Sequence, residues 1–179
     1  GLANRRLFEE HFHQCQLLGA RNKEWSAIAL LDLNQFKQLN DLHGHAAGDR
    51  MLQEVAVRLQ HTVRASDVIA RFGGDEFTLL LQNLGKSEAQ ATHHMRLLYN
   101  KLHNALAQTY NLDSITHEAS ASIGFTLIDP EQYIPLNELL RQADTQMYAN
   151  KKMRAPDNAA LQQAASATNQ ISAGKVSTP

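Results

Sequence analysis

The sequence predicts an α/β fold in which helices pack on a mostly antiparallel sheet. Short apolar runs of strand length alternate along the chain with longer segments whose apolar residues recur at helical spacing. Two strand-like runs, residues 67–70 and 77–81, are separated by a turn containing Gly73 and Gly74, which predicts an antiparallel hairpin. The length of 179 residues fits one domain with a sizeable core.

The first half of the chain carries two predicted helices, a strand and the hairpin. Residues 4–18 and 48–63 show helical periodicity, and the continuous apolar run 26–33 predicts a buried strand. Residues 71–77 form the turn of the hairpin. The residues expected to face the core are Leu7, Phe8, Phe12 and Cys15 in the first helix, and Leu52, Val55, Ala56, Leu59 and Val63 in the second.

The second half adds two helices and one strand. Residues 87–109 predict a long helix capped by Ser87, residues 118–127 a strand, and residues 136–152 the last helix. Residues 157–179, rich in Ala, Ser, Thr, Gln and Asn, predict a short helix extension followed by a linker. The inward-facing residues are expected to be Ala91, Met95, Leu98, Leu102 and Leu106, and later Leu139, Leu140, Ala143 and Met147.

Composition excludes several classes of partner and site. A net charge of −1 gives no electrostatic reason to bind nucleic acid or an anionic membrane. The single cysteine, Cys15, excludes an internal disulfide, fits a reducing and thus cytoplasmic compartment, and is predicted to be core rather than a nucleophile. No apolar run approaches the ~20 residues of a membrane span. The nine histidines show no zinc-binding spacing.

The most informative motif is the run Arg71-Phe72-Gly73-Gly74-Asp75-Glu76-Phe77. Adjacent glycines allow a tight turn and a close approach by a ligand, and the two acids that follow offer hard oxygen ligands for a divalent metal. A tight hairpin with solvated acids at its tip is the alternative. A further carboxylate, Asp32, ends the apolar run 27–33, where a buried strand commonly presents a metal ligand.

Several segments in the same order make the chain resemble the GGDEF family, the diguanylate cyclase domain of bacterial signalling proteins. The resemblance rests on residues 1–6, 32–49, 73–77, 122–124 and 143–151. It implies a ferredoxin-like core over residues 1–156, related to the palm of nucleotide cyclases and polymerases. It also implies a fragment of a longer protein with an upstream sensory domain, in which the parent protein could be membrane-anchored although this domain is not.

The resemblance implies that two GTP molecules condense to cyclic di-GMP and pyrophosphate on a transient homodimer, with Mg²⁺ or Mn²⁺. Metal ligands would be Asp32, the Leu33 carbonyl, Asp75 and Glu76. Asp75 would be brought opposite Asp32 by the hairpin and would also accept the proton, with Glu76 in support. Gly73 and Gly74 would let the turn pass close to the nucleotide.

Other positions of the motif would bind the substrate. Asp49 would read guanine, since a carboxylate can accept from the N–H donors of the base, and Asn40 would contact the base edge or the ribose. A helix N-terminal acid and a turn-forming Asn are the alternatives. His45 would line the pocket or serve as a structural hydrogen-bonding residue. Phe36 would pack in the core beside the nucleotide.

Two lysines, Lys37 and Lys151, would hold the β- and γ-phosphates. The chain departs from the family pattern after Lys151, where a Gly-Arg-Asn is usual and Arg154 arrives one position early. Asn34 stands where an Asp is commoner, with a small expected effect. An Arg-x-x-Asp pair, Arg64 and Asp67, matches the family's inhibitory product site, in which the arginine would address guanine O6 and N7 and the aspartate would accept from the N–H donors of the base.

Two functions therefore remain. The chain is either an active diguanylate cyclase or a non-catalytic module that binds GTP or cyclic di-GMP, for example one joined to an EAL phosphodiesterase domain. The retained signature residues 73–77 and Asp32 favour the enzyme. The altered residues 154–156 and the linker-like tail keep the second function open.

Overall fold

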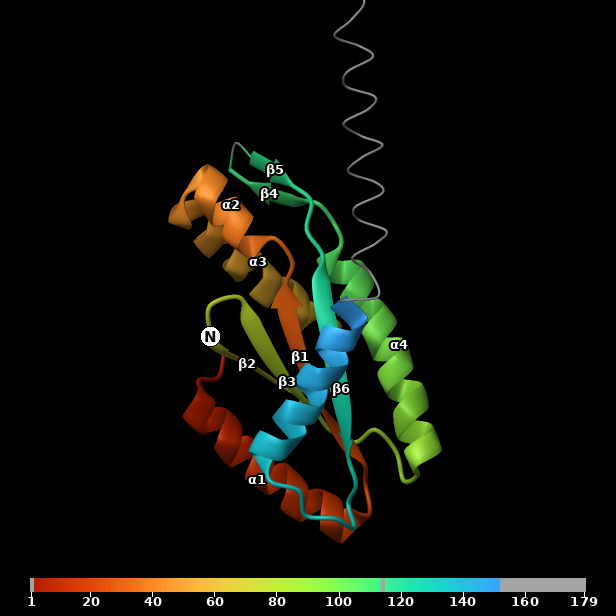
Figure 1. The fold of residues 1–179 in the computed structure, drawn as a ribbon. Helices are drawn as coiled ribbons and strands as arrows, with labels where there is room; N and C mark the ends of the chain where they lie inside the picture. Colours follow the sequence, from red (N-terminus) through yellow and green to blue (C-terminus); the bar gives the residue numbers. More distant parts are fainter. Residues whose placement is uncertain (1, 114, 152–179) are drawn as a thin grey trace, which may run out of the picture.

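The computed structural model describes residues 2–113 and 115–151, and it shows a four-stranded antiparallel sheet with helices on both faces (Figure 1). The strand order is β2–β3–β1–β6, and every pairing is antiparallel. The strands are β1 (Ser26–Leu33), β2 (Val68–Gly73), β3 (Glu76–Leu81) and β6 (Ala121–Ile128). Helices join β1 to β2 and β3 to β6, so the predicted ferredoxin-like arrangement is confirmed.

Alternate residues of each strand face two different helical layers, because side chains of a strand point alternately to opposite sides. Ala27, Ala29 and Leu31 of β1 belong to the larger core cluster, to which α3 (His45–Thr62) and α4 (Glu88–Leu106) also contribute. Ile28 belongs to the second cluster, which includes residues of α1 (Arg5–Asn22) and of the helix over residues 136–151. In Figure 1 this last helix is blue and crosses the sheet beside α1.

Most predicted elements are present, with shifted ends. The strand over residues 26–33 is confirmed, and Ser87 caps α4 by accepting a hydrogen bond from the Gln90 N–H. The first helix is longer than predicted and runs to Asn22. Leu7 was wrongly expected in the core: it is 43% exposed, while the other three predicted residues of that helix are buried. The strand predicted from residue 118 begins at 121, and the helix predicted to end at residue 109 ends at 106.

The region between β1 and α3 holds a helix that the sequence analysis did not predict. This helix, α2 (Phe36–His43), is joined to α3 by Gly44, whose positive φ of 81° suits a residue without a side chain. The second helix therefore starts at His45 rather than at residue 48. A short hairpin was also missed, β4 (Tyr110–Leu112) with β5 (Ile115–His117), since strands of three residues show too little alternation.

The helix over residues 136–151 lies in direct contact with the backbone of β6. A Cβ atom placed on Gly124 would collide with the Ala143 carbonyl oxygen and the Met147 backbone nitrogen, and would lie 2.7 Å from the Met147 Cβ. Glycine at position 124 is thus required for this helix to reach the sheet.

The predictions for residues 152–179, including Arg154 and the linker, lie outside the described residues. Within the described ranges, no helix combines the length and the apolar character that a bilayer crossing needs.

Candidate functional site

Strand register brings two of the predicted acids together. In the β1–β3 pair Asp32 is directly opposite Glu76, and in the β1–β6 pair it is opposite Ser122. Residues opposite each other in an antiparallel pair have Cβ atoms about 4.5–5.5 Å apart on the same face, and like charges there repel. Two carboxylates in this arrangement form a site of negative charge at the end of the sheet.

The Gly-Gly turn closes this end of the sheet. Gly74 has a φ of 55°, and its carbonyl oxygen accepts a hydrogen bond of 3.0 Å from the Arg71 Nε. The β2–β3 register shifts between Arg71 and Gly73. Asp75 was expected to lie opposite Asp32, but it occupies the turn itself, and Glu76 is the residue opposite. The one-residue offset follows from the two-residue loop, which leaves Glu76 as the first residue of β3.

Lys151 is the cation that pairs with Asp32. Its Nζ lies 2.6 Å from Asp32 Oδ1, with side chains 49% and 20% exposed. The helix over residues 136–151 brings Lys151 there, across 119 positions of sequence. A pair this exposed contributes at most about 1 kcal/mol, so a bound metal or phosphate can displace the lysine at small cost. Lys37 is exposed in the first turn of α2.

These residues fit a divalent metal that takes part of its coordination from the substrate. Within the described ranges, no group of three or more His, Cys, Asp or Glu side chains forms a complete ligand set. Mg²⁺ commonly uses one or two carboxylates and completes its shell with water and phosphate oxygens. Asp32 and Glu76, in register and mutually repulsive, meet that requirement.

Asn40 and Asp49 lie on neighbouring helices, α2 and α3. The Asn40 Oδ1 is buried and has no hydrogen-bond partner among the described residues. It lies where a side chain on Gly48 would be, so this glycine makes room for the carboxamide. Asp49 is exposed and lines a cavity of about 570 Å³ together with Gly73 and Arg71 of the hairpin. Asp49 is the fifth residue of its helix and lies beyond the first turn, so the alternative that it serves only as a helix N-terminal acid loses its basis.

Phe36 and His45 differ in their surroundings. Phe36 is partly buried against the larger core cluster, as predicted. His45 is the exposed first residue of α3. No hydrogen bond joins it to another described residue, so the structural alternative for His45 receives no support.

Asn34 has a role that the sequence analysis missed. Its Nδ2 donates to Ser120 Oγ at 2.9 Å, and its Oδ1 accepts from Ser122 Oγ at 2.9 Å. The asparagine links the end of β1 to the start of β6 through these two hydrogen bonds. An aspartate has no N–H group and could not donate to Ser120. The only signal in the sequence was the departure from the family pattern at this position.

The Arg-x-x-Asp pair forms a closed turn before β2. The two carboxylate oxygens of Asp67 accept from the backbone N–H groups of Arg64 at 2.9 Å and Gln82 at 3.0 Å. The Arg64 residue is exposed, and both residues line a cavity of about 480 Å³. Leu2 and Ala3 line this cavity and also the cavity beside Asp49.

Comparison with known proteins agrees with the resemblance. The sequence model of the family described as "Diguanylate cyclase, GGDEF domain" matches residues 1–156. The chain is 38% identical over 150 residues to the bifunctional diguanylate cyclase/cyclic di-GMP phosphodiesterase MucR of Pseudomonas aeruginosa, covering 84% of this chain and 21% of MucR. It is 34% identical over 155 residues to the cyclic di-GMP phosphodiesterase NbdA of the same species, covering 84% of this chain and 18% of NbdA.

A solved structure shows the same fold. The crystal structure of the GGDEF domain of YfiN, or TpbB, from Pseudomonas aeruginosa matches with a TM-score of 0.75 and 34% identity, covering 86% of this chain and 92% of that one. The chain spans only about a fifth of the two relatives MucR and NbdA. The family match over residues 1–156 and these identities establish that the chain belongs to the diguanylate cyclase GGDEF domain family.

Proposed function

We propose that this domain is a diguanylate cyclase, which condenses two GTP molecules into cyclic di-GMP and pyrophosphate. The observation that carries the proposal is the register of Asp32 with Glu76 beside the turn that holds Asp75. A structural hairpin has no need for three carboxylates at one end of the sheet. A triphosphate bound with a divalent metal does need them, because its charge must be neutralised and its α-phosphate positioned.

Asp32, the Leu33 carbonyl, Asp75 and Glu76 would hold Mg²⁺ or Mn²⁺, which would neutralise the triphosphate charge when bound. Asp75, at the tip of the turn, accepts the proton of the attacking 3′-hydroxyl. Gly73 and Gly74 leave room for the phosphates, and Lys37 and Lys151 bind the terminal ones, with Lys151 leaving Asp32 as it does so. His45, at the exposed start of α3, lines the entrance of the nucleotide site.

Each domain binds one GTP, so the reaction requires two domains that face each other. The dimer is transient, because each product molecule must be released before the next pair of substrates binds. An upstream sensory domain controlling this association would explain why the family domain makes up only part of the relatives.

The alternative is a module that binds GTP or cyclic di-GMP without catalysis and is joined to an EAL phosphodiesterase domain. The 34% identity to NbdA, named a phosphodiesterase, favours it. Incubation of the chain with GTP and Mg²⁺, followed by chromatography, separates the two functions. Cyclic di-GMP that accumulates over many turnovers supports the cyclase. Nucleotide binding without product at any protein concentration supports the module and excludes the cyclase.

Asp49→Ala is expected to weaken the binding of GTP more than that of ATP, by about 1–3 kcal/mol, because the guanine N–H donors lose their acceptor. Titration calorimetry with both nucleotides measures the difference. Asp41→Ala is the control, since Asp41 is an exposed carboxylate on the neighbouring helix. Equal losses for GTP and ATP would show that Asp49 does not read the base.

Arg64→Ala is expected to relieve inhibition by cyclic di-GMP and to leave the initial rate unchanged. The substitution removes the exposed guanidinium but keeps the turn, since the Arg64 backbone N–H, not its side chain, bonds to Asp67. The charge-assisted hydrogen bonds from the Arg64 guanidinium to guanine supply much of the affinity for cyclic di-GMP, and alanine cannot make them. Initial rates against added cyclic di-GMP test this, with Arg96→Ala on α4 as the control. An inhibition curve that matches the unsubstituted protein would assign any feedback to another site.

A further inference from the structure

The peptide bond between Leu33 and Asn34 lies at the end of β1, beside the acids of the candidate site. Its N–H donates to the Ser120 carbonyl oxygen at 2.9 Å, on the β6 side of the strand. This peptide bond is trans, and in a planar trans peptide the N–H and the carbonyl point in opposite directions. The Leu33 carbonyl, one of the proposed metal ligands, therefore points to the β3 side, where the β1–β3 pairing ends and the Gly-Gly turn lies.

Asn34 holds this peptide bond with its side chain as well as its backbone. The carboxamide donates to Ser120 Oγ and accepts from Ser122 Oγ, each at 2.9 Å. Ser122 is buried, and a hydrogen bond is stronger in such surroundings than in water. We call these two bonds and the backbone bond to Ser120 the Asn34 clamp. The clamp fixes the plane of the peptide bond and thus the direction of the Leu33 carbonyl.

The residue after Asn34 has a backbone conformation that needs support from its surroundings. Gln35 has a φ of 62° and a ψ of 15°, in the left-handed region that residues with a side chain rarely adopt. Such conformations persist where neighbouring contacts hold them. The Asn34 clamp holds one side of Gln35, and the Leu39 N–H, which donates to the Gln35 carbonyl oxygen at 3.1 Å, holds the other. The clamp therefore also sets the start of α2, which carries Lys37 in its first turn.

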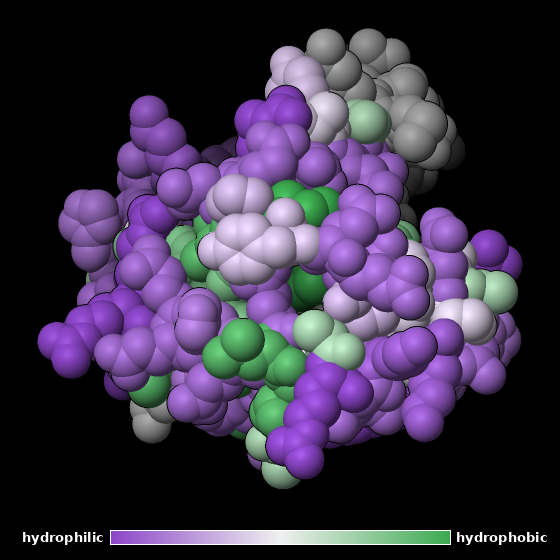
Figure 2. Space-filling view, turned by 90° about the horizontal axis from the view of Figure 1, so that it is seen from below, coloured by the Kyte–Doolittle hydropathy of each residue, from purple (hydrophilic) through white to green (hydrophobic). Residues whose placement is uncertain are grey.

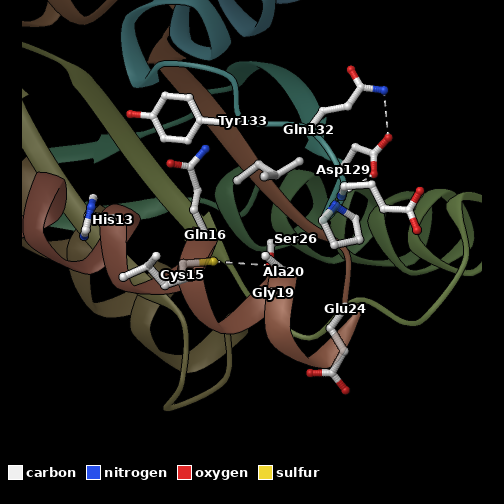
Figure 3. Close-up of a pocket in the computed structure, with 14 residues that line it drawn as sticks. His13, Cys15, Gln16, Gly19, Ala20, Glu24, Ser26, Asp129, Gln132 and Tyr133 are labelled. Carbon is white, nitrogen blue, oxygen red and sulfur yellow. Dashed lines mark hydrogen bonds between the residues drawn. The ribbon is translucent and has the colours of Figure 1, made fainter.

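The opposite end of the β1–β6 pair has no comparable link among the described residues. Ser26, which is opposite Ile128 in the register, accepts from the Cys15 thiol of α1 at 3.3 Å instead (Figure 3). Burial raises the pKa of this thiol, which therefore stays protonated as the donor. Figure 2 views the molecule from this end and shows hydrophobic atoms in a hollow of a largely hydrophilic surface. The clamp is thus a feature of the end where the carboxylates lie, not of the strand pair as a whole.

From these contacts we propose that Asn34 is a positioning residue for the metal site, an inference that rests on the proposed cyclase function. Its clamp keeps the Leu33 carbonyl directed toward the turn, so that this oxygen is already oriented when a divalent metal binds beside Asp32. Without the clamp the peptide bond is free to rotate, and the metal loses an oriented ligand. Residues that orient metal ligands typically change metal affinity or activity about 10–100-fold.

The test measures binding of Mn²⁺ alone to the full chain, from the electron paramagnetic resonance signal of the free ion. Asn34→Ala removes both side-chain bonds of the clamp and is expected to weaken Mn²⁺ binding about tenfold. Asn34→Asp can accept from both serine hydroxyls, with Ser120 now the donor, and should bind Mn²⁺ at least as tightly as the unsubstituted chain. Asn100→Ala, at an exposed position of α4, is the control. Equal affinity of Asn34→Ala and this control, or an equal loss in Asn34→Asp, would overturn the proposal.

The Mg²⁺ dependence of cyclic di-GMP formation separates positioning from a general loss of structure. With Asn34→Ala, the Mg²⁺ concentration that gives half the maximal rate is expected to rise about tenfold, and excess Mg²⁺ should restore the rate. A rate that is lowered equally at every Mg²⁺ concentration would refute the positioning role. If the unsubstituted chain binds Mn²⁺ but forms no cyclic di-GMP, the proposed function fails, and the Mn²⁺ affinities still decide the role of Asn34. Absence of Mn²⁺ binding to the unsubstituted chain would overturn both.

Discussion

Asp75→Asn and Glu76→Gln are each expected to abolish cyclic di-GMP formation while the domain stays folded. Glu76 is directly opposite Asp32 across the β1–β3 pair, and Asp75 occupies the turn beside it. Each substitution keeps the shape of the side chain and removes one charge, so the loss falls on metal binding and proton transfer. Losses of such groups typically lower rates by about 10²–10⁴-fold.

The measurement is cyclic di-GMP produced from GTP and Mg²⁺, with thermal unfolding followed in parallel by circular dichroism. Neither acid is part of a core cluster, and removal of one like charge from the Asp32–Glu76 pair relieves repulsion. The melting temperature is therefore expected to stay equal or rise. Glu118→Gln, an exposed acid outside the site, is the control. Activity near that of the control in both variants would refute the catalytic assignment.

Gly124→Ala is expected to destabilise the domain by about 3 kcal/mol or more, because its methyl group would overlap the backbone of the helix over residues 136–151. Ala143 and Met147 present backbone atoms there, and backbone atoms cannot rotate away. For a domain of this size the melting temperature should fall by roughly 6–12 °C. The helix that moves also carries Lys151, so its pairing with Asp32 is lost as well.

Gly48→Ala is the matched control for this substitution. Its added methyl group meets mainly the side chain of Asn40, which can rotate, and alanine favours the helix in which it lies. Thermal unfolding of both variants distinguishes a backbone collision from a side-chain one. Similar melting temperatures for the two variants would show that the last helix adjusts freely on the sheet.

The sequence by itself determined the family, the fold class and most elements. Each of these is a local or periodic property: the apolar run of β1, the helical stripes, and the two glycines of the turn. Residues such as Phe8, Phe12 and Cys15 were placed correctly in the core because the helical period alone selects one face. The prediction that Leu7 is buried was wrong because its position lies at the edge of that face, where the helical period does not decide burial.

Only the tertiary structure decided how distant residues meet. The offset of one residue that sets Glu76, not Asp75, against Asp32 depends on the length of the loop between two paired strands. The contact of Lys151 with Asp32 and the need for glycine at position 124 depend on how the last helix packs across the sheet. Such contacts join residues far apart in the chain, and no local pattern carries information about them.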